Sequence, residues 1–227
     1  MSIFVFMQVG DDPNVDLMVK SINLSNPSAR IIQCSDPNTK KITGVSEVYR
    51  LDSDTNNLMT FRLEIFSKLN LSDSAIYLDT DILVLKEITA KNLLEDADVA
   101  LCHRSFNINN YINTKIRNID LSEYSNRTIG QIYPIIACFT VSKSHEFWRA
   151  CLSNLLKLDS KFHYWYGDQE AMRNIADSGK FSLCYMPESK VACLPEYFNE
   201  YPAATGLHFK GPNRKQYMNK FYEFYFK

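Results

Sequence analysis

An apolar run at residues 75–85 is interrupted only by Asp79-Thr80-Asp81. The residues on both sides of this interruption predict buried strands. Side chains two positions apart in an extended chain point to the same side, so both carboxylates are expected to face one place. Two like charges at a buried edge repel each other and lose hydration, and a divalent cation offsets both costs. Oxygen ligands suit Mg²⁺ or Mn²⁺, which in turn bridge to phosphate oxygens of a substrate.

A turn is the alternative for this pair. Asp-x-Asp also occurs in turns, where the side chains accept hydrogen bonds from backbone N–H groups. The apolar residues on both sides of Asp79 and Asp81 include no Gly, Pro or Asn. Their absence favours strands over a turn.

The composition bounds the class of protein. The chain has 227 residues, of which 45% are hydrophobic and 22% charged, with a net charge of −1. This predicts one domain with a full core and argues against a nucleic-acid partner, which would require a basic surface. No run is long enough for a transmembrane helix, and the first ten residues lack the basic start of a signal peptide, so a cytoplasmic protein is expected. The six cysteines form no C-x-x-C, which predicts buried free thiols and no zinc site.

The first third of the chain predicts a parallel sheet. Residues 3–9 are a strand pattern, residues 16–22 have helical spacing, and residues 29–34 are a second strand pattern. In such a βαβ unit, ligands bind at the carboxyl ends of the strands. Asp11 and Asp12 follow the first strand, where they either meet a ligand or cap the helix.

Residues 45–51 predict a third strand, and residues 58–69 form an amphipathic helix pattern. Arg62 lies beside the apolar face of that helix. Such an arginine is either a solvated partner of a carboxylate or, so close in sequence to the aspartate pair, a group for phosphate or for the metal site.

The second half predicts further strands at residues 98–102, 132–141, 181–186 and 191–194, and a helix at residues 143–158. Residues 105–127 have no clean period and are expected to be a long excursion with some helix, of the kind that serves as a lid or binding loop. Gly167-Asp168 opens another helix, with Asp168 as N-cap. Gln169 then projects from the helix start, where it can meet a ligand.

Taken together, these motifs resemble the glycosyltransferases of family 8, the group of nucleotide-sugar enzymes with the GT-A fold that includes glycogenin and bacterial lipooligosaccharide galactosyltransferases. The run at residues 77–82 is nearly identical to the metal-binding signature of that family. The Asp11-Asp12 pair resembles its nucleoside-binding opening, and Arg62 falls at its diphosphate-side arginine. His208, Gly211 and Arg214 reproduce its late His-x-x-Gly-x-x-Lys with Arg for Lys.

The resemblance implies a metal site and a phosphate site. Asp79, Asp81 and His208 would hold Mn²⁺ or Mg²⁺. Gly211 would let the backbone approach the diphosphate of a UDP-sugar, and Arg214 would pair with that diphosphate. The implied fold is α/β, with a mostly parallel Rossmann-like central sheet flanked by helices.

The resemblance also implies a reaction. Asp168 and Gln169 would lie near the sugar, with Gln169 on the face of the anomeric carbon opposite the leaving group. A hexose would pass from the UDP-sugar, with retention of configuration, to a hydroxyl of a glycan or lipid-linked acceptor. The chain departs from the family pattern at two places, of which the first concerns the donor-sugar or acceptor contacts. Ile136-Ala137-Cys138 lacks the Asn and Gly of the family strand, and Lys215-Gln216 replaces a Pro-Trp.

Within a single domain at 1–227, we expect residues 1–104 to bind the nucleotide and residues 105–214 to contact the sugar and the acceptor. Acceptor contacts would come from 105–127 and 195–202. Residues 215–227 interleave aromatic residues and lysines, so this tail either lies on a membrane surface or packs on the domain as a helix.

Three other functions fit parts of the pattern. A haloacid-dehalogenase-type phosphatase also places Asp-x-Asp after a strand, but it requires that strand early and Thr or Val where Leu83 stands. A sugar nucleotidyltransferase usually carries a glycine-rich loop after the first strand, whereas Gly10 stands alone. A glycosyltransferase-like protein that binds without turnover would share every motif, and only activity separates it from an enzyme.

Overall fold

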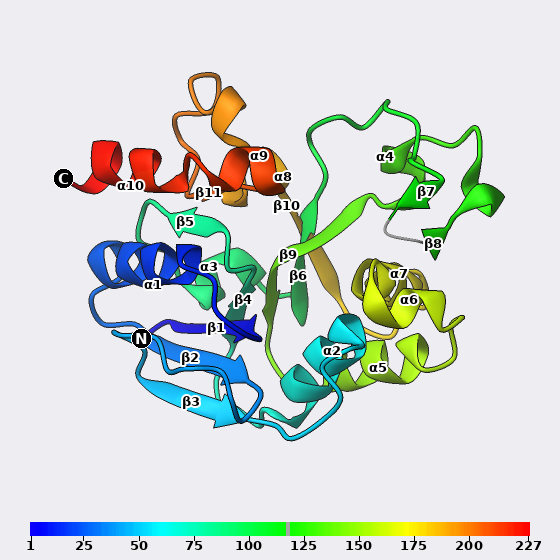
Figure 1. Cartoon of the computed structure of the whole chain (residues 1–227), viewed down its shortest axis with the longest axis horizontal. Coiled ribbons are helices and arrows are strands. Elements are labelled where there is room, and N and C mark those ends of the chain that lie inside the picture. The colour runs from blue at the N-terminus through cyan, green and yellow to red at the C-terminus, as the bar shows by residue number, and fades with distance from the viewer. Residues whose placement is uncertain (117–118) are drawn as a thin grey trace.

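A seven-stranded sheet with strand order β10-β6-β9-β4-β1-β2-β3 forms the centre of the chain (Figure 1). We describe it from a computed structural model, which covers residues 1–116 and 119–227. In spatial order the strands are Leu183–Pro187, Val99–His103, Ile135–Ser142, Ala75–Leu78, Ile3–Gln8, Arg30–Ser35 and Glu47–Arg50. β9 runs antiparallel to β4 and β6, and all other neighbours in this sheet are parallel. The expected mostly parallel α/β sheet is therefore confirmed.

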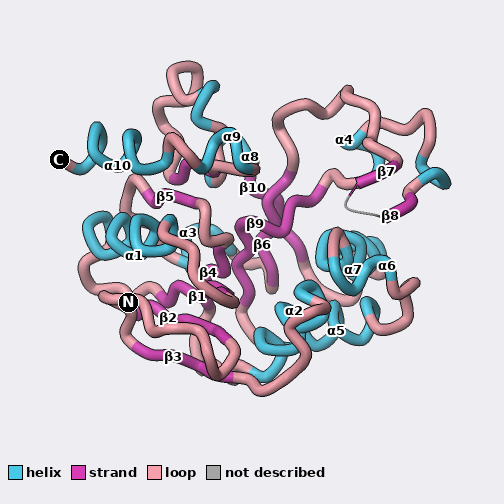
Figure 2. The backbone as a smooth tube through the Cα atoms, viewed as in Figure 1, coloured by secondary structure: helices cyan, strands magenta, loops and turns pink. Residues whose placement is uncertain are grey.

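Two short two-stranded sheets and the helices surround this centre (Figure 2). The short sheets pair β5 (Ile82–Val84) with β11 (Gly206–His208), and β7 (Lys115–Ile116) with β8 (Ile119–Asp120). The helices are α1 (Asn14–Ser25), α2 (Leu58–Lys68), α3 (Ala90–Leu94), α4 (Ile129–Ile132), α5 (Glu146–Leu155), α6 (Lys161–Tyr164), α7 (Gly167–Asp177), α8 (Glu188–Val191), α9 (Pro212–Lys215) and α10 (Met218–Phe226). Two 3-10 turns span Ser122–Tyr124 and Pro195–Tyr197.

The sheet is covered on both faces because its strands are apolar on both. Along β1, Phe4 and Phe6 belong to one core cluster, while Ile3 and Val5 belong to the other. This alternation follows from the period of two in a strand. The first cluster packs under α1 and α10, and the second under α2, α5 and α7 (Figure 1). A parallel sheet buried on both faces exposes its functional groups at the strand ends.

The predicted βαβ unit is confirmed, since β1 and β2 are parallel neighbours joined by α1. The strand expected at 191–194 is wrong, because Val191 ends the helix α8 and Cys193 forms only an isolated bridge to Leu207. In the excursion at 105–127, the short β7–β8 hairpin and a 3-10 turn take the place of the expected helix. Residues 117–118 of that excursion lie outside the described residues.

All six cysteines are free, and all but Cys184 are buried. The expectation of buried free thiols is thus confirmed for five of them. Burial raises the pKa of Cys151 and Cys138 well above the ordinary thiol value, which keeps both protonated.

The C-terminal tail packs on the domain as a helix. Met218 and Tyr222 of α10 are buried in the cluster shared with α1, whereas Phe224 is 85% exposed. This confirms the packing alternative for one face of the tail. Among the described residues, no helix combines the length and apolar character needed to cross a bilayer.

Candidate active site

The two aspartates lie in a turn at the carboxyl end of β4. Thr80 and Asp81 form the turn that leads into β5, so the expectation of an extended chain through the pair is wrong. The reason is that β4 and β5 belong to different sheets, and the chain must change direction between them. The turn is held by backbone hydrogen bonds from Asp79 N to Cys138 O (2.9 Å) and from Phe209 N to Asp81 O (2.8 Å).

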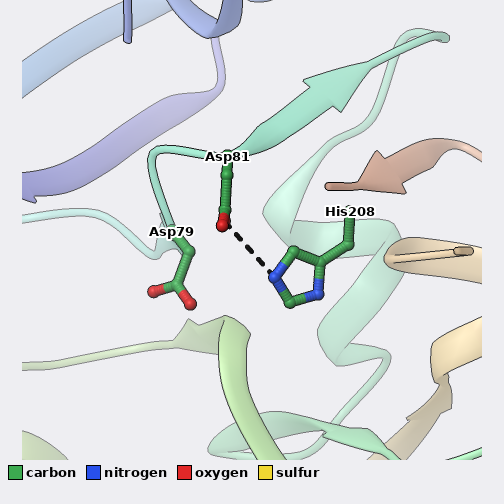
Figure 3. A group of neighbouring side chains, drawn as sticks. All are labelled: Asp79, Asp81 and His208. Atoms are coloured by element: carbon green, nitrogen blue, oxygen red, sulfur yellow. Dashed lines mark ion pairs between the residues drawn. The ribbon is translucent and has the colours of Figure 1, made fainter. Parts of the chain in front are cut away.

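His208 reaches this turn through the β5–β11 ladder. It pairs with Ile82, the residue after Asp81, and its Nε2 lies 3.3 Å from Asp81 Oδ1 (Figure 3). One ligand atom each from Asp79, Asp81 and His208 lies within 4.8 Å of the others. Two carboxylate oxygens and one imidazole nitrogen are a donor set that suits Mn²⁺ and accommodates Mg²⁺. The residues that the sequence nominates as metal ligands are therefore together.

Charge is balanced inside this group. Burial favours the neutral form of Asp81, but the cations His208 and Lys215 outweigh it and lower the pKa of that carboxyl. Burial likewise opposes a charge on His208, yet the neighbouring carboxylate of Asp81 raises the pKa of the imidazole. Without a metal, a proton on His208 thus takes part in neutralising Asp81. A bound metal would replace that proton, because a ligating imidazole must be neutral.

Arg62 forms an ion pair with Asp79, the first aspartate of the pair. It is 7% exposed, so the solvated alternative for this arginine is excluded. Its Nη1 lies 2.8 Å from Asp79 Oδ1 and 3.2 Å from Asp168 Oδ2, and its Nη2 donates to Ala137 O at 2.8 Å. The amphipathic helix α2 thereby anchors the first aspartate of the pair to the start of α7.

Asp168 does not cap α7, contrary to expectation. The N-cap is Tyr166, in a left-handed conformation with φ 62°. Asp168 is two residues further along, the second residue of the helix, and its carboxylate binds Arg62. Burial raises the pKa of Asp168, and Arg62 counteracts part of that rise. Gln169 follows, and its backbone N–H donates to Asp168 Oδ1 at 2.8 Å. Its side-chain Oε1 is buried and accepts no hydrogen bond from the described residues, which leaves it available to a ligand.

Of the two acids after β1, Asp12 has partners on both sides. Asp12 Oδ1 accepts hydrogen bonds from the backbone N–H and the side-chain amide of Asn14, the first residue of α1 (2.9 and 3.0 Å). The N-cap itself is Pro13, so the expected capping role of Asp12 is wrong. Its Oδ2 also lies 3.1 Å from the ammonium of Lys215, which connects it to the metal group. Asp11 is exposed to solvent.

Lys215 is the residue that sequence reasoning missed. Gly211 has φ 81° and leads into α9, whose last two residues diverge. Arg214 forms a two-pronged ion pair with Glu196, with Nε 2.9 Å from Oε2. Lys215 Nζ instead lies 3.1 Å from Asp12 and 3.8 Å from Asp81. The available signal was the replacement of Pro-Trp by Lys215-Gln216, which adds a second cation directly after Arg214.

No family model and no curated protein matches the sequence. Solved structures do match. The galactosyltransferase LgtC, in complex with donor and acceptor sugar analogues, aligns over 99% of this chain and 96% of its own, with a TM-score of 0.58 and 13% identity. An active-site mutant of LgtC aligns over 96% of this chain and 95% of its own, with a TM-score of 0.58 and 14% sequence identity. The bifunctional glycosyltransferase WbbM, in its apo form, aligns over 93% of this chain and 46% of its own, with a TM-score of 0.52 and 13% sequence identity. These similarities show that the chain has the GT-A fold.

Proposed function

We propose that this protein is a metal-dependent glycosyltransferase that moves a hexose from a UDP-sugar to a hydroxyl of a glycan or lipid-linked acceptor. The observation that carries the proposal is the convergence of Asp79, Asp81 and His208 at the carboxyl edge of a GT-A sheet. The similarity to LgtC, whose structure holds donor and acceptor sugar analogues, supports the reaction class.

Different residues of the chain would bind the metal, the diphosphate and the nucleoside of the leaving group. Asp79, Asp81 and His208 would hold Mn²⁺ or Mg²⁺, which supplies Lewis-acid stabilisation of the departing diphosphate. Lys215 would pair with that diphosphate from the side of Asp12, and Arg214 would reach it on release from Glu196. Gly211 lets the backbone come close, because nothing lies within 4 Å of the position where a Cβ would stand. Asp11 and Asp12 would contact the nucleoside.

On the sugar side, Arg62 fixes the orientation of Asp79 and Asp168. Gln169 would turn its free Oε1 toward the anomeric carbon, where an amide oxygen stabilises developing positive charge. Because a neutral amide, not a carboxylate, lies opposite the leaving group, the acceptor hydroxyl would attack the anomeric carbon on the same face from which UDP departs. This attack gives retention of configuration.

The decisive test is release of UDP from a panel of UDP-sugars with Mn²⁺, with acceptor present and absent. We expect metal-dependent turnover of at least one donor and its loss in Asp81→Ala. Metal-dependent binding of UDP without turnover of any donor would instead identify a glycosyltransferase-like binding protein.

We also propose that the exposed face of the tail touches a membrane on the cytoplasmic side, where a lipid-linked acceptor would be met. Tyr217, Phe224 and Tyr225 are 48%, 85% and 38% exposed, and Lys220 and Lys227 lie among them. Aromatic and basic side chains on one helix suit the headgroup region of anionic bilayers. Sedimentation with anionic vesicles should fall in Phe224→Ser; equal sedimentation of both proteins would reject the contact.

A further inference from the structure

Arg104 is a buried cation without an acidic partner. It follows β6 directly and is 6% exposed. Its Nε donates to Tyr133 O at 2.9 Å, and its backbone N–H donates to Pro134 O at 2.8 Å. Within the described part of the chain, no carboxylate forms an ion pair with it, and its Nη1 and Nη2 atoms donate no hydrogen bond. These two nitrogens are not among the fully enclosed atoms of the described residues, so they are open to a ligand while the protein supplies no counter-charge to them.

Lys210 adds a second positive charge at the same place. It is exposed and follows Phe209, whose backbone N–H donates to Asp81 O at 2.8 Å. It lies close enough to Arg104, Glu188 and Asp79 for their charges to act on its ammonium. Lys210 forms no ion pair with another described residue. The carboxylate of Glu188 is already engaged, since its Oε2 accepts the backbone N–H groups of Ser105 (2.9 Å) and Phe106 (3.2 Å). Asp79 is paired with Arg62, so Glu188 is the acid that remains against the two cations, and a net positive charge results.

The sheet topology separates these cations from the nucleoside. β4 and β6 both run antiparallel to β9, which lies between them, so Asp79 and Arg104 stand at the same edge of the sheet. Adjacent strands are about 4.8 Å apart, which puts β6 roughly 10 Å from the strand that leads to the metal group. β1, which leads to Asp12, lies on the opposite side of β4. A diphosphate between Lys215 and the metal group therefore leaves Arg104 to another part of the substrate.

The segments next to Arg104 are those expected to contact the acceptor. Phe106 stacks on Tyr197, with ring centroids 4.5 Å apart and planes inclined by 5°. This contact joins the beginning of the excursion at 105–127 to the segment 195–202. These are the two segments expected to contact the acceptor, and they meet next to Arg104.

We propose that Arg104 and Lys210 form a subsite for an anionic group, a carboxylate or a phosphate, carried by a sugar substrate. The two free guanidinium nitrogens suit a two-pronged contact with such a group, and the ammonium adds a point charge. The anionic group belongs either to the transferred sugar or to the acceptor sugar. That the ligand is a sugar rests on the proposed function, whereas the anion preference rests on these two side chains alone.

The donor source is tested by isothermal titration calorimetry with UDP, UDP-glucose and UDP-glucuronate in the presence of Mn²⁺. If the transferred sugar carries the charge, UDP-glucuronate binds about tenfold more tightly than UDP-glucose, as one charge-assisted contact provides. This preference should disappear in Lys210→Met while the affinity for UDP stays the same. An equal loss of affinity for UDP itself would assign both cations to the diphosphate and overturn the subsite.

The acceptor source is tested by ligand-observed NMR with glucose, glucuronate and glucose 6-phosphate, with and without UDP and Mn²⁺. If the acceptor carries the charge, an anionic monosaccharide binds about tenfold more tightly than glucose, and Lys210→Met removes the difference. Titrations without nucleotide keep the result independent of the proposed function, which fails separately if UDP and Mn²⁺ do not bind. The absence of any Lys210-dependent preference in both series overturns the subsite.

Lys20→Met is the matched control, because Lys20 is exposed on α1 and should leave every preference unchanged. Arg104→Lys and Arg104→Gln form a second pair, with thermal unfolding as a check on the fold. Arg104→Lys should retain part of the anion preference and Arg104→Gln should lose it. If Arg104→Gln does not fold, the Lys210→Met result decides.

Discussion

Asp79 and Asp81 are two residues apart, yet different parts of the molecule neutralise them. Asp79 pairs with Arg62, a nearly buried residue of α2 that also holds Asp168 and the carbonyl of Ala137. Asp81 pairs with His208 and lies near Lys215, both from the end of the described chain. One aspartate is thus fixed by the core, and the other by a segment laid over it.

The cation that neutralises Asp79 is held rigidly, whereas the lysine near Asp81 can move. Arg62 has no room to move, because its guanidinium is enclosed and has three partners. Lys215 is about one third exposed and is held by carboxylates at 3.1 and 3.8 Å, so it can turn to a phosphate at little cost. We infer that Asp79 and its partner Arg62, which we call the Asp79 side, keep one geometry with or without a ligand. Asp81 with His208 and Lys215, which we call the Asp81 side, would rearrange when a ligand binds.

Removal of Arg62 should produce the largest change in stability. In Arg62→Met, Asp168 loses its cation while it stays buried, and breaking such a pair costs about 3–5 kcal/mol of unfolding free energy. Burial already raises the pKa of Asp168, and the variant lacks the cation that restrains this rise. The folded variant therefore binds a proton at Asp168 more readily than the unfolded chain does. Its loss of unfolding free energy relative to the wild type is small at acid pH and grows as the pH rises through the pKa of Asp168.

Urea unfolding of the wild type and Arg62→Met at pH 5 and pH 8 measures this dependence. Arg149→Met, which removes an exposed arginine paired with Glu146 on α5, is the control and should cost below about 1 kcal/mol at both pH values. A deficit for Arg62→Met that is equally small at both pH values would contradict the assignment of Arg62 as the rigid side.

Removal of Asp81 should affect metal binding more than folding. Asp81→Asn should weaken Mn²⁺ binding by more than about 100-fold, since even groups behind metal ligands contribute 10–100-fold. The fold should survive, because the amide keeps the size of the side chain. Titration calorimetry with Mn²⁺ checks this, with the exposed Asp73→Asn as control. Unchanged Mn²⁺ affinity in Asp81→Asn would remove the metal site from this turn.

Lys215→Met tests the adjustable side. We expect the affinity for UDP in the presence of Mn²⁺ to fall about tenfold, as the loss of one charged contact to phosphate implies. The affinity for Mn²⁺ alone should not fall, because the variant removes a cation that competes for Asp81. Arg214→Met should weaken UDP binding less, since its guanidinium is engaged by Glu196. The reverse order of the two variants would return the phosphate role to Arg214.

The smallest effect is expected from the ion pair that holds α9. A double-mutant cycle of Arg214→Gln and Glu196→Gln should give a coupling below about 1 kcal/mol, because both side chains are partly exposed. Thermal or urea unfolding of the four proteins measures it. A coupling of several kcal/mol would mean that the Asp81 side is as rigid as the Asp79 side.

The sequence predicted the sheet and the metal group well, for physical reasons. Alternating apolar strands and an amphipathic helix are local patterns, and the aspartate pair demands compensation wherever it lies. It did not predict the turn at Thr80, since the partner sheet of β5 comes from residues 206–208. The roles of Lys215 and Arg214 also depend on long-range partners, Asp12 and Glu196, which no local pattern reveals. Asp168 was assigned to a cap because its buried partner Arg62 is distant in sequence.

The contact between β5 and β11 also sets an order of events during synthesis. His208 follows Asp81 by more than a hundred residues, which a ribosome takes on the order of ten seconds to add. The strands β1 to β4 and the aspartate pair are all synthesised before it, so a nascent chain contains both aspartates while it still lacks the histidine. Chains that stop before His208 would therefore lack one of the three residues of this metal group.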